Sequence, residues 1–359
     1  MKTVLRVAGV FVGTVIGAGY ASGQEILQFF VSHGLWGIAG TVVTILILPL
    51  LGYQSIVLGS KLQVSNHKKV VYHICGKYLG SAIDIAYTFF LFGIGAIMIA
   101  ASGSLFEQSF GIAPIWGYLF LTICLIFTLL LNTLGIFTLI GAVTPYIFAL
   151  LIIIVIYSLI TSDGNIIELE STAKDQLSIS PNWFISAVIS LSFNFMVGFA
   201  MMIVAGGKEK DQKNAKLGAI IGGVIIGFVA FIIAVGVYAN IDLVQHAEMP
   251  TIMLAAEMNP IIGILMAIGI LAMIYNSAVS MFYTFVARFF QPETKRFKTS
   301  AVIACILGLG IGFMGFVDLV NTVYPLLGYI GFIVIVGLII QLLKTNKVKN
   351  EAPRQRADG

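Results

Sequence analysis

The sequence predicts an all-α polytopic membrane protein with ten transmembrane helices, and three observations lead to this prediction. Of the 359 residues, 59% are hydrophobic and only 10% are charged, and the mean hydropathy of +1.02 excludes an ordinary soluble domain. Apolar segments of spanning length, about 20 residues each, recur along the chain. The charged residues fall almost entirely between these segments.

The apolar segments can be assigned in order along the chain. If the N-terminus lies in the cytoplasm, only Lys174 of the 20 lysines and arginines falls on the outer side, in agreement with the positive-inside rule. All three tryptophans then lie at the outer interface, where an amphipathic ring is favoured. A missed or extra span would scramble this pattern, which supports ten spans and two cytoplasmic termini. The segments are 4–31, 35–59, 81–105, 115–132, 135–160, 182–204, 215–239, 261–288, 299–316 and 320–343.

The first segment carries small and polar residues in its middle, GTVIGAGYASGQE over residues 13–25. Glycine lowers helix stability by roughly 1 kcal/mol relative to alanine, and a membrane helix breaks only where the break is buried or lines a cavity. The run from Ser22 to Glu25 has the pattern of a capping box, at which a helix begins again. We expect two helical halves with an unwound stretch around Gly17–Gly19. The alternatives are glycines that serve only helix packing and a signal peptide cleaved near Ala21.

The longer connections between segments also carry information. Residues 61–80 are polar and basic and predict a surface helix on the inner face. Residues 161–181 predict an acidic outer loop, and residues 240–260 predict a helical or re-entrant outer loop. Residues 344–359 predict a charged cytoplasmic tail. None of these connections has the character of a separate soluble domain.

The sixth segment, residues 182–204, carries polar residues in mid-membrane. Ser190, Ser192 and Asn194 alternate with apolar residues, and Gly198 follows. An uncompensated amide in hydrocarbon is costly, so Asn194 is expected to face other helices or a cavity. An ordinary interhelical hydrogen bond, worth about 1 kcal/mol or less, is the alternative. The pattern predicts that helix 6 is broken as helix 1 is.

The two interrupted segments occupy corresponding positions in two halves of opposite orientation. This arrangement is the best sequence indicator of a transporter built from inverted repeats, with its site at the membrane midplane. The predicted organisation is a first five-helix repeat at 1–160, the outer loop at 161–181, a second repeat at 182–343 and the tail at 344–359. A non-transporting sensor and a passive channel are the alternatives. Because no Ser/His, paired-Asp or His–metal constellation falls at membrane depth, an enzyme is not predicted.

The string GTVIGAGYASGQE and the ten-segment layout resemble the bacterial YkvI-type membrane proteins over nearly the whole chain. More remotely, the two breaks and the topology resemble the amino acid–polyamine–organocation superfamily, whose members share the five-plus-five LeuT-type fold. The resemblance implies a multi-pass protein of the bacterial cytoplasmic membrane. It further implies a secondary transporter of amino acids or related amines, driven by sodium or protons, that alternates between outward-open and inward-open states.

The resemblance also implies a substrate site between helices 1, 3, 6 and 8. In the fold, backbone groups of the broken helix 1 hold the substrate carboxylate, and a bulky aromatic residue of helix 6 covers the substrate. Phe193 matches this aromatic residue, Asn194 matches the polar position beside it, and Gly198 matches the second break. The implied substrate-binding residues are Gly17, Ala18, Gly19, Phe193, Asn194 and Gly198.

In sodium-coupled members, one ion lies between carbonyls of helix 1 and hydroxyls of helix 8. Positions 273, 276 and 277 repeat the spacing that puts three groups on one helix face, and a hard cation favours oxygen ligands. Asn276 stands where a hydroxyl residue is more usual, and helix 5 lacks the lysine that replaces the ion in some proton-coupled members. Ordinary helix–helix hydrogen bonding is the alternative for Asn276 and Ser277. The implied ion-binding residues are Gly13, Ile16, Met273, Asn276 and Ser277.

Two carboxylates within the spans are functional candidates by default. Glu25 is either the partner in the capping box or a group at the outer vestibule that titrates or contacts an amine. Asp84 is either charge compensation at a helix N-terminus or part of a proton relay. The four histidines fall in loops and the three cysteines show no pairing pattern, so neither a transition-metal site nor a disulfide framework is predicted.

The resulting prediction is a secondary active transporter of a small amino acid or related amine. Its coupling ion is Na⁺, with H⁺ as the alternative, and no other cofactor is expected. The predicted partners are the lipid bilayer and the small-molecule substrate, and no nucleic acid. A non-transporting membrane sensor with the same fold is the remaining alternative.

Overall fold

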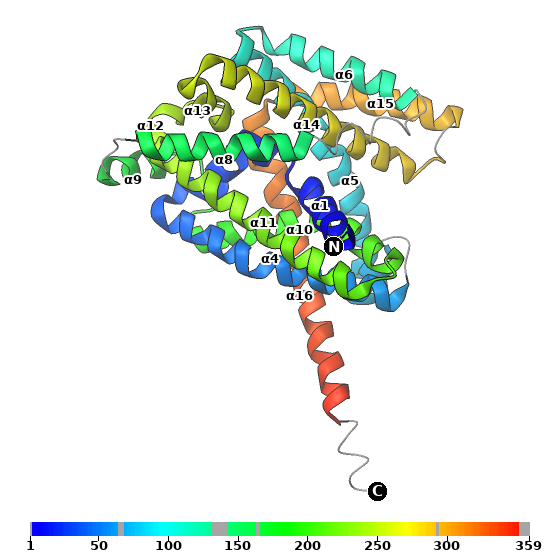
Figure 1. Ribbon diagram of the computed structural model, residues 1–359. Helices are drawn as coiled ribbons and strands as arrows, with labels where there is room; N and C mark the ends of the chain where they lie inside the picture. The colour runs from blue at the N-terminus through cyan, green and yellow to red at the C-terminus, as the bar shows by residue number, and fades with distance from the viewer. Residues whose placement is uncertain (1, 64–67, 131–142, 163–165, 292–293, 352–359) are drawn as a thin grey trace, which may run out of the picture.

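In the computed structural model, every regular element of the described residues is a helix (Figure 1). The structure describes residues 2–63, 68–130, 143–162, 166–291 and 294–351. Six helical stretches among these residues are long and apolar enough to cross a membrane, and two shorter apolar helices, Pro114–Leu130 and Tyr146–Thr161, accompany them. The six are Gln24–Leu62, Val70–Phe110, Trp183–Lys208, Gln212–Ala239, Pro260–Ala287 and Phe316–Gln341. The junction of the fourth and fifth predicted spans lies outside the described residues.

The last helix runs beyond the final predicted span, into the segment predicted as a tail, because it continues to Glu351. The predicted outer loops at 161–181 and 240–260 contain short helices of their own. The helices after the first segment are α4 (Gly34–Leu62), α5 (Lys68–Phe110), α6 (Pro114–Leu130), α8 (Val143–Thr161), α9 (Ile166–Lys174), α10 (Trp183–Lys208), α11 (Gln212–Ala239), α12 (Ile241–Val244), α13 (Pro250–Met258), α14 (Pro260–Ala287), α15 (Lys295–Gly312) and α16 (Phe316–Glu351).

The first predicted segment is divided into separate helical pieces. α1 (Lys2–Val15) ends before Ile16 and Gly17, α2 (Ala18–Ser22) follows, and α3 (Gln24–Phe29) begins after a second interruption at Gly23. Gly23 has φ 80°, a left-handed conformation that glycine adopts without strain. The unwound residues are therefore Ile16 and Gly17, so the interruption is shorter than the predicted stretch around Gly17–Gly19 and begins earlier.

The predicted break in helix 6 is wrong, because α10 is continuous from Trp183 to Lys208. Its polar residues Ser186, Ser190 and Asn194 follow one another at intervals of four, which places them on one face of an intact helix. The Asn194 amide also donates to the Ser190 carbonyl (2.9 Å) within the same helix. Gly198 permits close packing instead of a break, since a Cβ there would lie 2.4 Å from Phe11 of α1.

The helices form two groups. α1, α4, α10 and α11 pack mainly against one another, and so do α5, α6, α14 and α15. Figure 1 shows α4, α10 and α11 in the lower part of the view and α6, α14 and α15 in the upper part. α16 contacts α10 and α5, and α8 contacts α11 and α14, so these two helices join the groups. Helix 1 divides between them, since α1 packs on α10 and α11 whereas α2 packs on α14.

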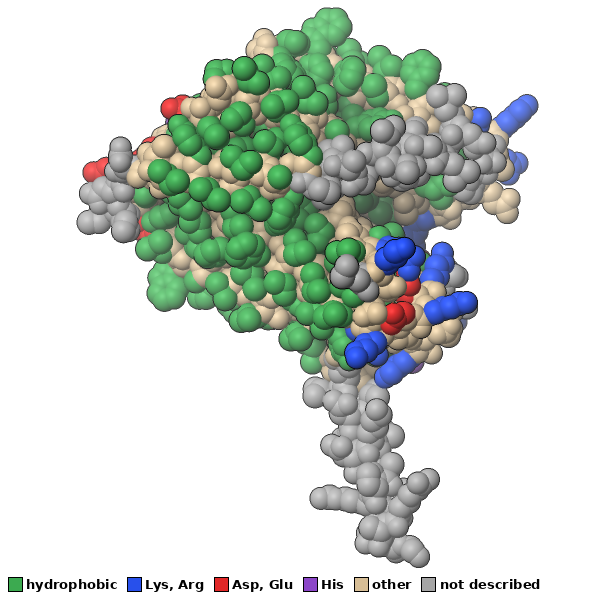
Figure 2. All heavy atoms as spheres, viewed as in Figure 1, with side chains coloured by type: hydrophobic (Ala, Val, Ile, Leu, Met, Phe, Trp, Pro, Cys, Tyr) green, Lys and Arg blue, Asp and Glu red, His purple; other side chains and the backbone are tan. Residues whose placement is uncertain are grey.

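The surface has an apolar band between polar ends. In Figure 2, hydrophobic side chains cover most of the visible face, and lysine and arginine side chains gather toward the end where α1 begins. At the opposite end, Glu170 of α9 accepts a hydrogen bond from the Leu35 N–H at the start of α4 (3.0 Å). A broad apolar surface of this kind is expected where helices face lipid.

Candidate functional site

The break in helix 1 leaves backbone carbonyls without their helical donors. The Gly17 N–H donates to the Val15 carbonyl (2.8 Å), and the Ala21 N–H donates to the Gly17 carbonyl (3.0 Å). In a continuous helix the Gly17 N–H would instead donate to the Gly13 carbonyl, and the Tyr20 N–H would donate to the Ile16 carbonyl. The carbonyls of Gly13 and Ile16 are thereby released, and these are the two that the sequence analysis assigns to an ion site.

The helix α14 lies against the break. A Cβ at Gly17 would lie 3.4 Å from the Ser277 hydroxyl, so Ser277 is beside the peptide bond that joins Ile16 to Gly17. Met273, one turn earlier on α14, is buried. Asn276 is partly exposed and forms no hydrogen bond with any other described residue. This face of α14 therefore presents a hydroxyl and an unengaged amide close to the released carbonyls.

A second polar centre lies between α3 and α10. The Asn194 amide donates to Glu25 Oε1 (2.8 Å) and contacts the Ser190 hydroxyl (3.3 Å). Glu25 is 2% exposed and Asn194 is 0% exposed. Because Asn194 lies near the middle of α10, the buried Glu25 carboxylate is at the level of the middle of a spanning helix. The structure thus joins a predicted proton-linked residue to a predicted substrate-binding residue.

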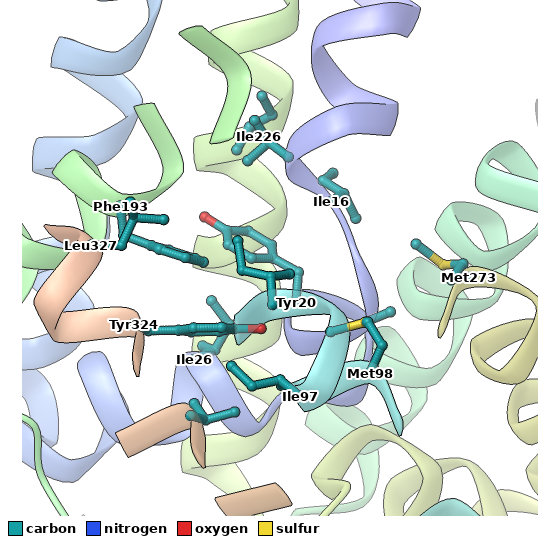
Figure 3. Packing of buried hydrophobic residues seen from close by; sticks show 14 of the residues in the cluster. Ile16, Tyr20, Ile26, Ile97, Met98, Phe193, Ile226, Met273, Tyr324 and Leu327 are labelled. Atoms are coloured by element: carbon teal, nitrogen blue, oxygen red, sulfur yellow. The ribbon is translucent and has the colours of Figure 1, made fainter. Parts of the chain in front are cut away.

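Aromatic side chains border Glu25. Phe193 of α10 stacks on Tyr324 of α16, with ring centroids 4.1 Å apart, and Tyr20 lies beside this pair (Figure 3). Gly19 allows a close approach, because a Cβ there would lie 2.9 Å from the Tyr324 hydroxyl and 3.2 Å from Glu25 Oε2. The sequence does not predict a role for Tyr324. A tyrosine in an apolar span has the pattern of a core residue, and only the proline that follows distinguishes Tyr324 from Tyr329.

Several polar atoms around Glu25 have no partner among the described residues. They are Asn194 Oδ1, the Tyr20 hydroxyl and Gln24 Oε1, and all three atoms are buried. Buried polar atoms are normally hydrogen-bonded, so each unpaired one requires an explanation, which a ligand or an ordered water would supply. The polar centre therefore offers groups to which a polar ligand or a water molecule can bind.

Two predicted residues have other positions. Gly198 faces Phe11 and Val15 of α1. Ala18 is the first residue of α2, and its side chain lies outside the described residues.

Glu25 is not the partner in a capping box, because the Ser22 hydroxyl accepts from the Gln24 N–H (3.3 Å) and the Glu25 carboxylate faces α10.

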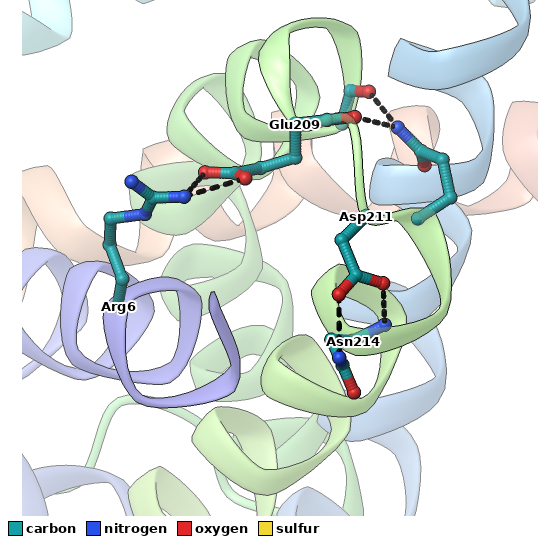
Figure 4. Close-up of polar contacts among 6 residues, drawn as sticks. Arg6, Glu209, Asp211 and Asn214 are labelled. Carbon is teal, nitrogen blue, oxygen red and sulfur yellow. Dashed lines mark hydrogen bonds and ion pairs between the residues drawn. The ribbon is translucent and has the colours of Figure 1, made fainter. Parts of the chain in front are cut away.

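A non-helical residue, Gly76 (φ 76°), divides α5, and Asp84 lies eight residues beyond it, past the first turn of the second part. It therefore provides no charge compensation at a helix N-terminus, and it forms an ion pair with Arg288 at the end of α14. The Arg288 guanidinium also lies 5.8 Å from the centroid of the Tyr87 ring. A second ion pair joins Arg6 of α1 to Glu209 after α10, at 2.6 Å (Figure 4). These two pairs link helices at the end of the molecule where α1 begins.

A pocket of about 400 Å³ lies among the loops that the sequence predicts to be outer. Its lining comes from α3, from the segment before α10, from the α12–α13 connection and from the start of α16. Gln24 and Gln28 of α3 line it together with the acidic residues Glu248 and Asp318. Gln24 directly precedes Glu25 in α3, so the same helix contributes to the pocket and to the polar centre. Within the described residues, no three His, Cys, Asp or Glu side chains are grouped as a metal site.

No known family model matches the chain. It is 27% identical over 360 residues to the membrane protein YkvI of Bacillus subtilis (strain 168), which covers 98% of this chain and 97% of YkvI. It is also 25% identical over 328 residues to the protein YyaD of the same organism, which covers 91% of this chain and 94% of YyaD. The similarity therefore extends along whole chains.

The fold is shared with solved transporter structures. A structure of MhsT in complex with L-phenylalanine matches with a TM-score of 0.65 and 17% identity, over 91% of this chain and 87% of MhsT. The manganese transporter of Eremococcus coleocola matches with a TM-score of 0.58 and 14% identity, over 94% and 78% of the chains. A Na⁺-coupled sialic acid symporter matches with a TM-score of 0.54 and 17% identity, over 90% and 76%. The chain is thus similar to the YkvI-type membrane proteins and has the LeuT-type fold of these transporters.

Proposed function

We propose that this chain is a secondary active transporter of a small amino acid or related amine, coupled to sodium. The observation that carries the proposal is the break at Ile16 and Gly17, which lies against Ser277 of α14 and continues into the buried centre at Glu25 and Asn194. Released backbone groups beside unpaired polar side chains, inside an apolar bundle, are typical of a binding site in a transporter. The fold shared with solved transporters supports the same assignment.

The sodium ion would bind between helix 1 and α14. Its ligands would be the carbonyls of Gly13, Ile16 and Met273, the Ser277 hydroxyl and the Asn276 amide oxygen. A hard cation prefers such oxygen ligands, and the two helix 1 carbonyls have lost their helical donors at the break. The solved sialic acid symporter of the same fold is described as Na⁺-coupled. The ion would hold helix 1 against α14 and thereby favour one arrangement of the two groups of helices.

Transport would follow from relative movement of the two groups. Helix 1 contacts both of them, since α1 packs on α10 and α11 and α2 packs on α14. A ligand at the break therefore contacts both groups at once. It can shift the equilibrium between outward-open and inward-open arrangements only by the difference of its affinities for the two. Residues 1–160 and 182–343 would form the two inverted repeats, with both termini in the cytoplasm of a bacterial cell.

The ion assignment is tested by thermal unfolding of the purified protein in sodium and in potassium. A ligand that binds the folded state at 100 times its Kd stabilises it by about 2.7 kcal/mol. We expect sodium to stabilise the wild type but not N276A/S277A. The control is T299A, which removes an exposed hydroxyl group from α15 and should keep the sodium effect. Equal sodium effects in all three proteins would contradict the site.

Transport itself is tested by uptake into proteoliposomes with an inward sodium gradient. We expect saturable uptake of at least one amino acid or amine that disappears when the gradient is dissipated. Uptake without saturation would indicate a passive channel. Specific ligand binding without uptake would indicate the non-transporting sensor.

Proton coupling is the second candidate, and Glu25 is the observation that favours it. Its buried carboxylate forms no ion pair with a described residue, and protonation would remove the cost of burying the charge. Uptake driven by a proton gradient without sodium, and abolished in E25Q, would establish this alternative in place of sodium coupling.

A further inference from the structure

Among the residues that the structure describes, Glu25 is a buried carboxylate without a cationic partner. It is 2% exposed, and its hydrogen-bond donor within the described residues is the Asn194 amide. The ion pairs of these residues join Arg6 to Glu209, Lys174 to Glu170 and Arg288 to Asp84, and none includes Glu25. A carboxylate inside a protein is strongly disfavoured as an anion unless a positive charge and hydrogen bonds compensate it. The site therefore lacks one positive charge or one proton.

The unpaired polar atoms favour a positively charged ligand over a proton on Glu25. Glu25 Oε2 faces Gly19 without a hydrogen bond from a described residue, and Asn194 Oδ1 and the Tyr20 hydroxyl are buried and unpaired. A proton on Glu25 would add a single O–H donor. A primary ammonium group carries one positive charge and three N–H donors, and has no acceptor. An ammonium group thus supplies the missing charge together with an N–H donor for Glu25 Oε2.

The aromatic side chains near Glu25 also suit an organic cation. Phe193 and Tyr324 stack with ring centroids 4.1 Å apart, and Figure 3 shows the Tyr20 ring close to this pair. Aromatic rings attract cations through their negative faces and pack against alkyl groups. An alkylammonium ion would place its charge at Glu25 and its carbon chain against the rings.

The pocket on the predicted outer side has an acidic lining, which suits a cationic ligand. Glu248 and Asp318 line it, and His246 is its one basic side chain among the lining residues, none of which is Lys or Arg. Acidic groups around a concave entrance raise the local concentration of cations. Gln24 lies both in this lining and directly before Glu25. The same short helix, α3, therefore contributes to the acidic pocket and carries the buried carboxylate.

We propose that the Glu25 carboxylate is the counter-charge for the ammonium group of the substrate, so that the substrate class is small primary amines that need no carboxylate of their own. This inference rests on the proposed transport function and narrows its substrate. Asn194 would orient the carboxylate through the bond to Oε1, and Phe193 and Tyr324 would contact the carbon chain. The protein supplies the carboxylate that a zwitterionic substrate would otherwise bring.

The test compares three solutes of similar size, butylamine, 2-aminobutyrate and butanol, by thermal unfolding and by isothermal titration calorimetry. The proteins are the wild type, E25Q and E168Q, which removes an exposed carboxylate on α9. We expect saturable binding of butylamine to the wild type and to E168Q, and at least tenfold weaker binding to E25Q. Butanol is expected not to bind, and 2-aminobutyrate is expected to bind more weakly than butylamine.

The outcomes separate this inference from the function on which it rests. Binding of 2-aminobutyrate that exceeds that of butylamine and is unchanged in E25Q overturns the inference, while the transporter proposal stands. Binding of 2-aminobutyrate that depends on pH and is lost in E25Q, with no binding of butylamine, identifies Glu25 as a proton carrier and also overturns it. Failure of every amino acid and amine to bind overturns both. If E25Q unfolds during purification, E25D replaces it, with the prediction of a several-fold lower affinity for butylamine.

Discussion

Asp84 and Glu25 are carboxylates inside the same helical bundle, but their surroundings differ. Asp84 pairs with Arg288 of α14, and both side chains are largely buried at 12% and 17% exposure. Glu25 is more deeply buried at 2% exposure, and an uncharged amide is its hydrogen-bond partner in the described chain. In the first case an arginine provides the positive charge, and in the second case no residue of the described chain does.

The difference separates a structural carboxylate from a functional one. A charge that serves only the fold can be balanced permanently by another side chain, as Arg288 balances Asp84. A charge that must accept a cation during a cycle cannot have a permanent partner, because that partner would occupy the binding site. Substitutions at the two residues should therefore have opposite consequences for stability and function.

The largest effect on stability is expected from D84A. Removal of Asp84 leaves the Arg288 guanidinium largely buried without its partner, and the loss of one member of such a pair costs about 3 kcal/mol. Unfolding of the purified protein in detergent, followed by intrinsic fluorescence, measures the change. D242A, which removes an exposed aspartate of α12, should differ little from the wild type. If D84A/R288A is as unstable as D84A, the ion pair does not explain the loss.

A smaller loss of stability is expected from N194A. The substitution removes the donor to Glu25, and an unsatisfied buried group costs about 2 kcal/mol. The loss should be smaller in an E25Q background, because a neutral amide is less costly to bury than a carboxylate. A double-mutant cycle of unfolding free energies measures this coupling. A coupling energy of zero would show that the Glu25–Asn194 contact contributes nothing in the folded protein.

A carboxylate outside the membrane extends the comparison to acidic pH. Partial burial tends to raise the pKa of Glu170, but hydrogen bonds from Lys174, the Leu35 N–H and Tyr238 outweigh burial and lower the pKa. Because the folded-state pKa is below the unfolded value of about 4.3, this group stabilises the fold above that pH and loses its effect as the pH falls through the folded pKa. We expect E170Q to lose less stability than the wild type on acidification from pH 6 to about pH 3. Parallel stability curves for the two proteins would contradict this.

The smallest effect is expected from R6A. Arg6 is 63% exposed and its partner Glu209 is 17% exposed, so the pair is close to water. Exposed pairs contribute less than about 1 kcal/mol and are screened by salt. The unfolding free energy of R6A should therefore be within about 1 kcal/mol of the wild type. A loss as large as that in D84A would remove the distinction between buried and exposed pairs.

Much of the fold could be predicted because apolar spans and charged connections are separated along the chain. The interruption of helix 1 could also be predicted, because Gly17 and Gly23 lie among small residues where a simple span would carry large apolar ones. The continuity of α10 could not be predicted from the sequence. Asn194 satisfies its amide within its own helix at Ser190, and Gly198 accommodates Phe11, so residues that suggest a break form an intact helix with one polar face.

The candidate site was predictable only where polar residues stand out against an apolar background. Glu25, Asn194 and Ser277 are conspicuous for this reason. Their partners are set by tertiary contacts between segments far apart in sequence, so neither the contact from Glu25 to Asn194 nor the pairing of Asp84 with Arg288 follows from local pattern. Tyr324 has no distinctive pattern because aromatic residues are also common in the core.

If Glu25 binds the substrate of a transporter, its substitution must abolish the current that the substrate carries. The most direct measurement is the transient current of proteoliposomes on a solid-supported membrane after a jump in butylamine concentration, for the wild type, E25Q and E168Q in parallel. We expect a saturable current in the wild type and E168Q, and none in E25Q reconstituted at the same density. Equal currents in the wild type and E25Q would contradict it.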